Sequence, residues 1–445
     1  MIEPTRHGTA ESRVGFHWAL VAFALLVFGG NWSHSNQQQI FITRYISVAE
    51  AVLHGVLPYS VTHVFYPMWG YPVTVALGLA LGHPTFVIEM LQLVSALLSL
   101  VAAYWLLDLQ KRLRDIPLFL PYFALCSVKW PDAFVAILFL LHVALSAKFI
   151  QSTASTRGRW IYLTAAGFVL ALIVNFRTEY FLFPLAEIGV AGAYFVRRRS
   201  KPLLMVAAAS ALACALGILP WYLYTAGSAS HARLTTSNGA GVAYISLGQL
   251  PGNPWGIRHL DSDAFKKANQ RGIADPYSEA GEHALTEAVD SAVAAHPAAF
   301  AMKVGRNLGM ALVGGLYTGE YANLLLTDPQ RTQLEQAHSV KGIPFSSVAI
   351  FAAEKALRIL SMPLLLLLML LFVRLKRPGH GAGDGVYPIL LSLILYRLAT
   401  VALIQYEPRH LNLIYAPLVF YVLILFQSRP LVAGKRGYSL KSFLR

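Results

Sequence analysis

Residues Asn36–Pro72 read NQQQIFITRYISVAEAVLHGVLPYSVTHVFYPMWGYP and lie between the first two strongly apolar segments of the chain. The stretch is too polar to span a bilayer, yet residues 41–56 carry apolar side chains at helical spacing. The opposite face of that helix holds Arg44, Ser47, Glu50 and His54. The pattern predicts a helix on a membrane surface, with its apolar face at the headgroup boundary, that Gly55 and Pro58 end.

The composition is that of a polytopic membrane protein. Of 445 residues, 56% are hydrophobic and only 13% are charged. The formal net charge is +14, but the basic residues gather at the ends of apolar segments, where they act as topology signals. This placement argues against nucleic acid as a partner. Cys126 and Cys214 lie within apolar segments and indicate no disulfide framework.

Long apolar segments predict an all-α fold with about ten transmembrane helices, because a span needs roughly 20 mostly apolar residues. The expected spans are residues 14–30, 85–107, 116–127, 133–150, 160–176, 180–196, 203–224, 348–373, 386–405 and 411–427. Residues 73–81 are apolar but too short to cross, so we expect a re-entrant or interfacial helix there.

The chain changes character over a long polar region between the seventh and eighth expected spans. We therefore expect three parts: an N-terminal transmembrane module over residues 1–224 with its first outer loop at 31–72, an exoplasmic or interfacial region over 225–347, and C-terminal transmembrane helices with a basic tail over 348–445. Gly, Asn and Pro near the start of the polar region predict a short extended or hairpin segment. Amphipathic helices are expected over residues 278–294 and 297–316.

Orientation follows from the alternate connections. The two termini and every second connection are basic, which places both termini in the cytoplasm of a multi-pass protein of the plasma (inner) membrane. The remaining five connections share the exoplasmic face. We expect them to converge on one site there.

Several short motifs follow one another in an order typical of one enzyme class. They are the Tyr45–Gly55 helix, Pro58-Tyr59, Phe65-Tyr66-Pro67, Pro220-Trp221, His296-Pro297 and Arg409-His410-Leu411. Their order resembles the polytopic GT-C glycosyltransferases, such as dolichyl-phosphate-mannose mannosyltransferases and lipid A aminoarabinose transferases. The resemblance implies a GT-C-like fold and an inverting sugar transfer from a polyprenyl-phosphate donor to a lipid or glycan acceptor on the exoplasmic face.

One position departs from this class. These enzymes usually carry an acidic residue about four positions before the tyrosine, as the probable base toward the acceptor, whereas Phe41 and Ile42 stand here. Asp132, in the next outer turn, is our first substitute as base, because a carboxylate near an interface is tuned by desolvation. The alternative is that Asp132 only caps the following helix. Glu50 is the second candidate as base. The alternative is that Glu50 only belongs to the solvated polar face of its helix.

A departing lipid phosphate also needs cations. The candidate phosphate ligands are Arg397, Arg409, His410, Arg177, Arg44 and Lys129. Arg397 is the most informative, because an unpaired charge inside an apolar span costs at least about 2.5 kcal/mol. The alternative for Arg397 is a structural pair with a carboxylate such as Glu407, and for the others it is interfacial anchoring.

The residue pattern indicates no metal site and no cofactor, because the histidines match no local ligand spacing. Two other functions compete with a glycosyltransferase. One is a transporter or flippase of lipid-linked saccharides, although the chain shows no internal repeat of the kind that transporters carry. The other is a catalytically inactive relative that binds a polyprenyl lipid, which the missing acidic residue before Tyr45 favours.

Overall fold

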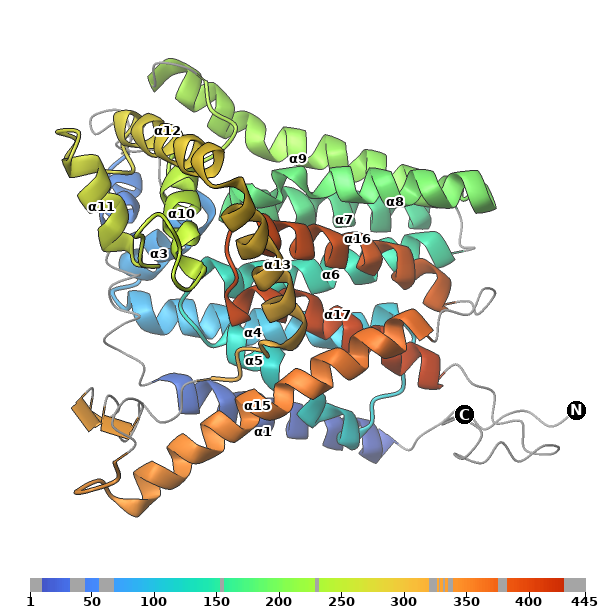
Figure 1. Cartoon of the computed structure of the whole chain (residues 1–445). Helices are drawn as coiled ribbons and strands as arrows, with labels where there is room; N and C mark the ends of the chain where they lie inside the picture. Colours follow the sequence, from blue (N-terminus) through green and yellow to red (C-terminus); the bar gives the residue numbers. More distant parts are fainter. Residues whose placement is uncertain are drawn as a thin grey trace, which may run out of the picture.

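The computed structural model describes residues 10–32, 45–55, 68–152, 156–228, 232–319, 339–374 and 382–427, with three short pairs between 326 and 334. Within these ranges nine helices are long and apolar enough to cross a membrane. They are α1 (Ala10–Trp32), α4 (Pro84–Leu106), α6 (Pro131–Gln151), α7 (Thr156–Phe176), α8 (Phe183–Arg198) together with the 3₁₀ turn η2 (Thr178–Leu182) that leads into it, α9 (Lys201–Ser228), α15 (Phe345–Arg374), α16 (Ala382–Leu403) and α17 (Pro408–Gln427). Figure 1 shows most of them running side by side.

The segment expected as a span over residues 116–127 is broken instead. A 3₁₀ helix, η1 (Leu113–Phe119), leads directly into the short helix α5 (Leu120–Cys126). Pro117 lies inside η1 and Pro121 in the first turn of α5, and each proline lacks the N–H that a continuous helix needs. The described residues therefore hold nine of the roughly ten expected spans.

The first and last spans start and end on the same side of the bundle. The Lys111 ammonium lies 3.0 Å from Nε2 of His17, and the Gln110 N–H donates to Oε1 of Gln427 at 2.7 Å. We call this side, with His17, Lys111 and Gln427, the terminal end. The opposite side, which carries Asp132 and Glu407, is the loop end.

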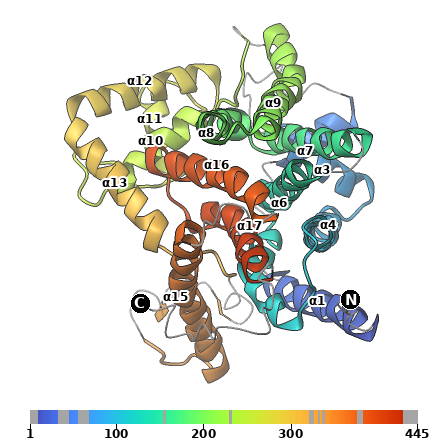
Figure 2. The ribbon, with the colours of Figure 1, turned by 90° about the vertical axis from the view of Figure 1, so that its right-hand side faces the viewer.

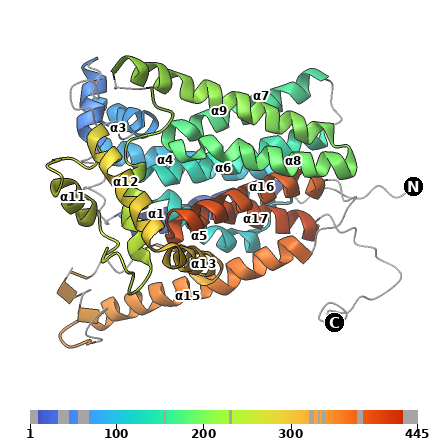
Figure 3. The ribbon, with the colours of Figure 1, turned by 45° about the horizontal axis from the view of Figure 1, so that its top comes forward.

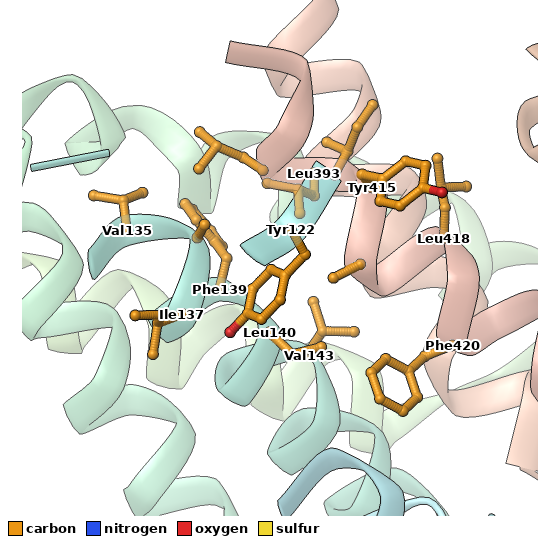
Figure 4. Packing of buried hydrophobic residues seen from close by; sticks show 14 of the residues in the cluster. Tyr122, Val135, Ile137, Phe139, Leu140, Val143, Leu393, Tyr415, Leu418 and Phe420 are labelled. Atoms are coloured by element: carbon orange, nitrogen blue, oxygen red, sulfur yellow. The ribbon is translucent and has the colours of Figure 1, made fainter. Parts of the chain in front are cut away.

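The core lies between the central helices α6, α16 and α17, as the end view in Figure 2 shows. Tyr122 of α5, Phe139 of α6, and Tyr415 and Phe420 of α17 are buried there among leucines and valines (Figure 4). Helix α15 lies at the outside and leaves leucines such as Leu367 and Leu370 exposed. Exposed leucines along a span indicate contact with lipid tails.

The first outer loop contains the expected amphipathic helix, over residues 45–53, and Gly55 follows it with a positive φ of 67°. Its apolar face packs on protein, so its expected position at the headgroup boundary is wrong. Tyr45 is buried against Tyr71, with 4.7 Å between the ring centroids, and Tyr71 belongs to the short apolar helix α3 (Gly70–Ala80). Residues 33–44 and 56–67 lie outside the described residues.

The polar region between α9 and α15 is helical where it is described. It contains α10 (Gly239–Ser246), η3 (Leu247–Gln249), α11 (Asp261–Asn269), α12 (Glu279–Ala295) and α13 (Pro297–Val313), all at the loop end (Figures 1 and 3). The two expected amphipathic helices correspond to α12 and α13. The expected extended or hairpin segment is wrong, because its glycines serve the packing and turns of short helices: a Cβ on Gly241 would lie 3.4 Å from the Tyr277 ring.

This region is tied to the bundle at the turn between α16 and α17. The Gln249 amide donates to the Tyr406 carbonyl at 2.8 Å, and Arg306 of α13 donates to the Gln249 carbonyl at 2.6 Å. The buried Lys303 of α13 donates to the carbonyls of Leu403 and Ile404, at 2.8 and 2.5 Å. These bonds fix the region between α9 and α15 against the loop end of α16.

Candidate active site

Six charged side chains of alternating sign meet at the loop end of the bundle. They come from the start of α6, the turn between α7 and α8, the inner face of α16, and the turn before α17 together with the first turn of α17. In order they are Glu407, Arg409, Asp132, Arg177, Glu179 and Arg397, which we call the ion chain. Three arginines and three carboxylates leave the ion chain without formal net charge.

Asp132 holds the middle of the ion chain. Its Oδ2 accepts from Nη2 of Arg177 at 2.6 Å and lies 3.9 Å from Nε of Arg409. Its side chain is only 1% exposed. Asp132 makes no capping hydrogen bond, because Trp130 occupies the N-cap position of α6, so the capping interpretation is wrong. The carboxylate is buried between two guanidinium groups, which favours a role in holding the two arginines over the expected role as base.

Arg397 forms the inner end of the ion chain. Its side chain is 2% exposed, and its Nη1 lies 3.0 Å from Oε1 of Glu179. Its Nε donates to the His410 carbonyl at 3.3 Å, and its guanidinium lies over the Tyr180 ring at 5.4 Å. The paired alternative therefore describes Arg397 correctly, but its partner is Glu179 and not Glu407.

Glu179 is the residue that sequence reasoning missed. It lies in the 3₁₀ turn η2 (Thr178–Leu182), and its second oxygen, Oε2, is 4.0 Å from Nη1 of Arg177. At 36% exposed, its side chain is more accessible than any other in the ion chain. An acidic residue in a three-residue turn between two apolar spans was the signal that pointed to it.

The other end of the ion chain meets an aromatic wall. Nη2 of Arg409 lies 2.5 Å from Oε2 of Glu407, and its guanidinium lies 4.3 Å from the centre of the Trp130 ring. Tyr317 stands beside Trp130, in the buried segment that follows α13, with 6.2 Å between ring centroids. The amide of Asn412 holds the Tyr317 backbone through bonds of 2.9 and 2.7 Å.

The remaining candidates lie elsewhere. Lys129 is buried in an ion pair with Glu89 of α4, with 2.6 Å between Nζ and Oε1, so its expected role as a phosphate ligand is wrong. His410 is next to Arg409; its carbonyl accepts from Nε of Arg397, and its imidazole is near enough to Asp132 to interact with it electrostatically. Glu50 is exposed on the helix over residues 45–53, and the ion pairs of the described residues do not include it. Arg44 lies outside the described residues.

An apolar groove of about 700 Å³ runs between α8 and α16. Small side chains of α8 open it, and its lining includes Ala186, Gly189, Ala193, Leu391 and Leu395. Figure 2 shows these two helices side by side.

One end of the groove lies near the ion chain, although the six side chains of the ion chain do not line it. Tyr396 lines the groove, and its hydroxyl donates to the Glu179 carbonyl. At the other end of the groove lie Arg197 and Arg198, in the last turn of α8. A charged cluster and a long apolar groove therefore lie next to each other and are linked by Tyr396.

Within the described ranges, no three His, Cys, Asp or Glu side chains gather as a metal ion would need. The buried His142 and Glu187 pair lies deeper in the bundle, with 3.1 Å between Nε2 and Oε1, and the second ring nitrogen of His142 lies 3.1 Å from the Ala166 carbonyl. Only two ligands of that kind meet there.

No family model and no curated protein matches the sequence. Among solved structures, the chain is similar to the archaeal oligosaccharyltransferase AglB from Archaeoglobus fulgidus, in complex with an inhibitory peptide and a dolichol-phosphate. The two share 13% sequence identity and a TM-score of 0.50, over 98% of this chain and 54% of that chain. The chain thus spans about half the length of that protein. At this identity the likeness concerns the fold, and the predicted GT-C-like polytopic fold is confirmed.

Proposed function

We propose that the protein is a membrane glycosyltransferase that moves a sugar from a polyprenyl-phosphate donor to a lipid or glycan acceptor. The observation that carries this proposal is the junction between the ion chain and the apolar groove. An isoprenoid tail fits a groove that opens toward the bilayer, and a phosphate fits the guanidinium groups of Arg397 and Arg177 at its end. The solved oligosaccharyltransferase with the similar fold holds a dolichol-phosphate, which supports the same donor class.

In this proposal the sugar lies between the phosphate and the aromatic wall. Trp130 and Tyr317 offer ring faces of the kind that contact sugars, and Arg409 is held against Trp130. The acceptor hydroxyl attacks the anomeric carbon as the bond from that carbon to the phosphate oxygen breaks. The electron pair of that bond stays on the polyprenyl phosphate, whose charge the arginines stabilise.

The proposal includes a direction in the membrane. In this proposal both termini lie in the cytoplasm of a plasma-membrane protein and the loop end faces the exoplasm, an orientation that the basic connections support. Labelling of single cysteines with a membrane-impermeant maleimide tests this orientation. A cysteine at Glu287 of α12 is expected to react from outside, and one at Asp108 beyond α4 only after permeabilisation. The reverse pattern would contradict the orientation.

The function is tested with the purified protein in proteoliposomes. A panel of synthetic polyprenyl-phosphate hexoses and pentoses serves as donor, and release of polyprenyl phosphate is measured with a membrane extract as the source of acceptor. Release is expected for at least one sugar. Movement of the donor between leaflets without release would show a flippase, and binding of polyprenyl phosphate with neither would show a lipid-binding relative.

A further inference from the structure

The ion chain carries equal numbers of arginines and carboxylates, which a site for an anionic lipid does not explain. Every arginine in it already has a carboxylate partner within 4.0 Å. An arriving phosphate therefore meets a site whose positive charge is already compensated. One carboxylate has to give up its place before the phosphate binds with full strength, because opposite charges in a site of low dielectric are strongly attracted.

Glu179 is the carboxylate that fits this exchange. Asp132 is 1% exposed and belongs to the first turn of a central span, so it has little room to move. Glu179 lies in the η2 turn and is 36% exposed. It also contacts two arginines of the ion chain, at 3.0 Å from Arg397 and 4.0 Å from Arg177, and its carbonyl accepts from the hydroxyl of Tyr396, which lines the groove.

We infer that Glu179 is a catalytic base that donor binding sets free. In the structure its two oxygens face Arg397 and Arg177. The donor phosphate replaces the carboxylate at these guanidinium groups, and the released side chain turns outward beside the anomeric carbon. This inference rests on the proposed function and adds to it the missing proton acceptor, since no acidic residue stands about four positions before Tyr45.

The step is balanced in atoms and charge. The acceptor hydroxyl gives its proton to an oxygen of Glu179, its oxygen bonds to the anomeric carbon, and the polyprenyl phosphate leaves with the electron pair. The bound phosphate also favours this proton transfer, because a neighbouring negative charge stabilises the neutral carboxyl form. When polyprenyl phosphate departs, Glu179 loses the proton to water and returns to the arginines. Base and donor thus compete for one pair of cations, and the base becomes available only when a donor is present.

The test is Glu179→Gln in the full-length protein, with two measurements. Binding of polyprenyl phosphate in nanodiscs is expected to tighten about tenfold, because the competing negative charge is gone. Turnover at saturating donor is expected to fall about 10²- to 10⁴-fold, because an amide does not take the proton. If Glu179 only held Arg397 in place, its replacement would weaken lipid binding and lower turnover together.

Two variants complete the design. Glu179→Asp keeps a proton acceptor on a shorter side chain and is expected to restore part of the turnover. Glu287→Gln makes the same chemical change in the ion pair between Glu287 of α12 and Arg271, in the turn after α11, and is expected to change neither measurement.

Each outcome separates the inference from the proposed function. Unchanged or weaker lipid binding in Glu179→Gln overturns the exchange, and unchanged turnover overturns the base, while the glycosyltransferase proposal stands in both cases. If the unaltered protein binds no polyprenyl phosphate, the proposed function fails and this inference fails with it.

Discussion

The Lys129–Glu89 pair and the ion chain lie at the same end of the bundle but differ in solvent access. Lys129 and Glu89 have side chains that are 4% and 2% exposed, and each ion-pairs with the other. In the ion chain, four of the six side chains are between 17% and 36% exposed. A closed pair stabilises only the fold, whereas charges that reach solvent are able to change partners. Solvent exposure therefore distinguishes charged side chains of a structural ion pair from candidate site residues more clearly than residue type does.

The largest effect is expected where the closed pair is broken. Lys129→Met leaves the Glu89 carboxylate buried without its cation, which destabilises a protein by about 3–5 kcal/mol. Thermal unfolding of the detergent-solubilised protein measures this loss. The double variant Lys129→Met/Glu89→Leu removes both charges and is expected to recover most of the stability. If the single variant unfolds like the unaltered protein, the pair is not the closed structural contact described here.

A substitution in the ion chain is expected to reduce lipid binding more than stability. Arg397→Gln removes a phosphate ligand and is expected to weaken binding of polyprenyl phosphate about 100-fold, or about 2.7 kcal/mol. Its effect on thermal unfolding is expected to be smaller than that of Lys129→Met, because Glu179 keeps Arg177 and water as partners. Equal loss of stability in both variants would remove the distinction between the two regions.

The membrane makes most of the fold predictable from sequence. A membrane span must make its backbone hydrogen bonds internally and present apolar side chains to lipid. A long apolar segment therefore has few alternatives to a transmembrane helix. The failures have local causes: Pro117 and Pro121 break the segment expected as a span, and the glycines around Gly241 belong to a helix that packs closely on Tyr277. Propensity alone does not tell a turn glycine from a packing glycine.

The site was predictable only in part, for a different reason. The sequence indicates which charges belong to the loop end, but partners depend on how each helix is rotated about its axis. The alternative to phosphate binding by Arg397 was a pair with a carboxylate such as Glu407, yet its face of α16 meets the η2 turn and Glu179. Lys129 was expected at the phosphate, although Glu89 inside the apolar α4 was available as its partner. An acidic residue inside a span is a signal for such a pairing.

Filling the groove beside the ion chain tests whether a lipid tail binds there. Gly189→Leu places a bulky side chain in the groove between α8 and α16, and a Cβ at this position meets no atom within 4 Å. Binding of polyprenyl phosphate is expected to weaken about tenfold, or roughly 1.4 kcal/mol, because the tail loses its contacts. Gly192→Leu is the matched control, since Gly192 lies on the same helix but does not line the groove. Equal effects of both variants would argue against a tail in this groove.

The smallest effect is expected at Lys303, a buried cation that is held by backbone carbonyls. Lys303 of α13 is fully buried, and its ammonium is held by the carbonyls of Leu403 and Ile404. Desolvation lowers the pKa of Lys303 from 10.5 to about 8. The native state then binds fewer protons than the unfolded state between about pH 8 and pH 10.5, so stability rises with pH across this window. A neutral amine still has two N–H donors for the two carbonyls.

The expected gain in the free energy of unfolding is about 1 kcal/mol between pH 8 and pH 9. Thermal unfolding at the two pH values measures it, and Lys303→Met, which has no proton to lose, is expected to abolish this part of the pH dependence. The same slope in both proteins would assign the effect to another group. Because Lys303 links α13 to the end of α16 without any carboxylate among its described partners, its stability contribution is expected to depend on pH.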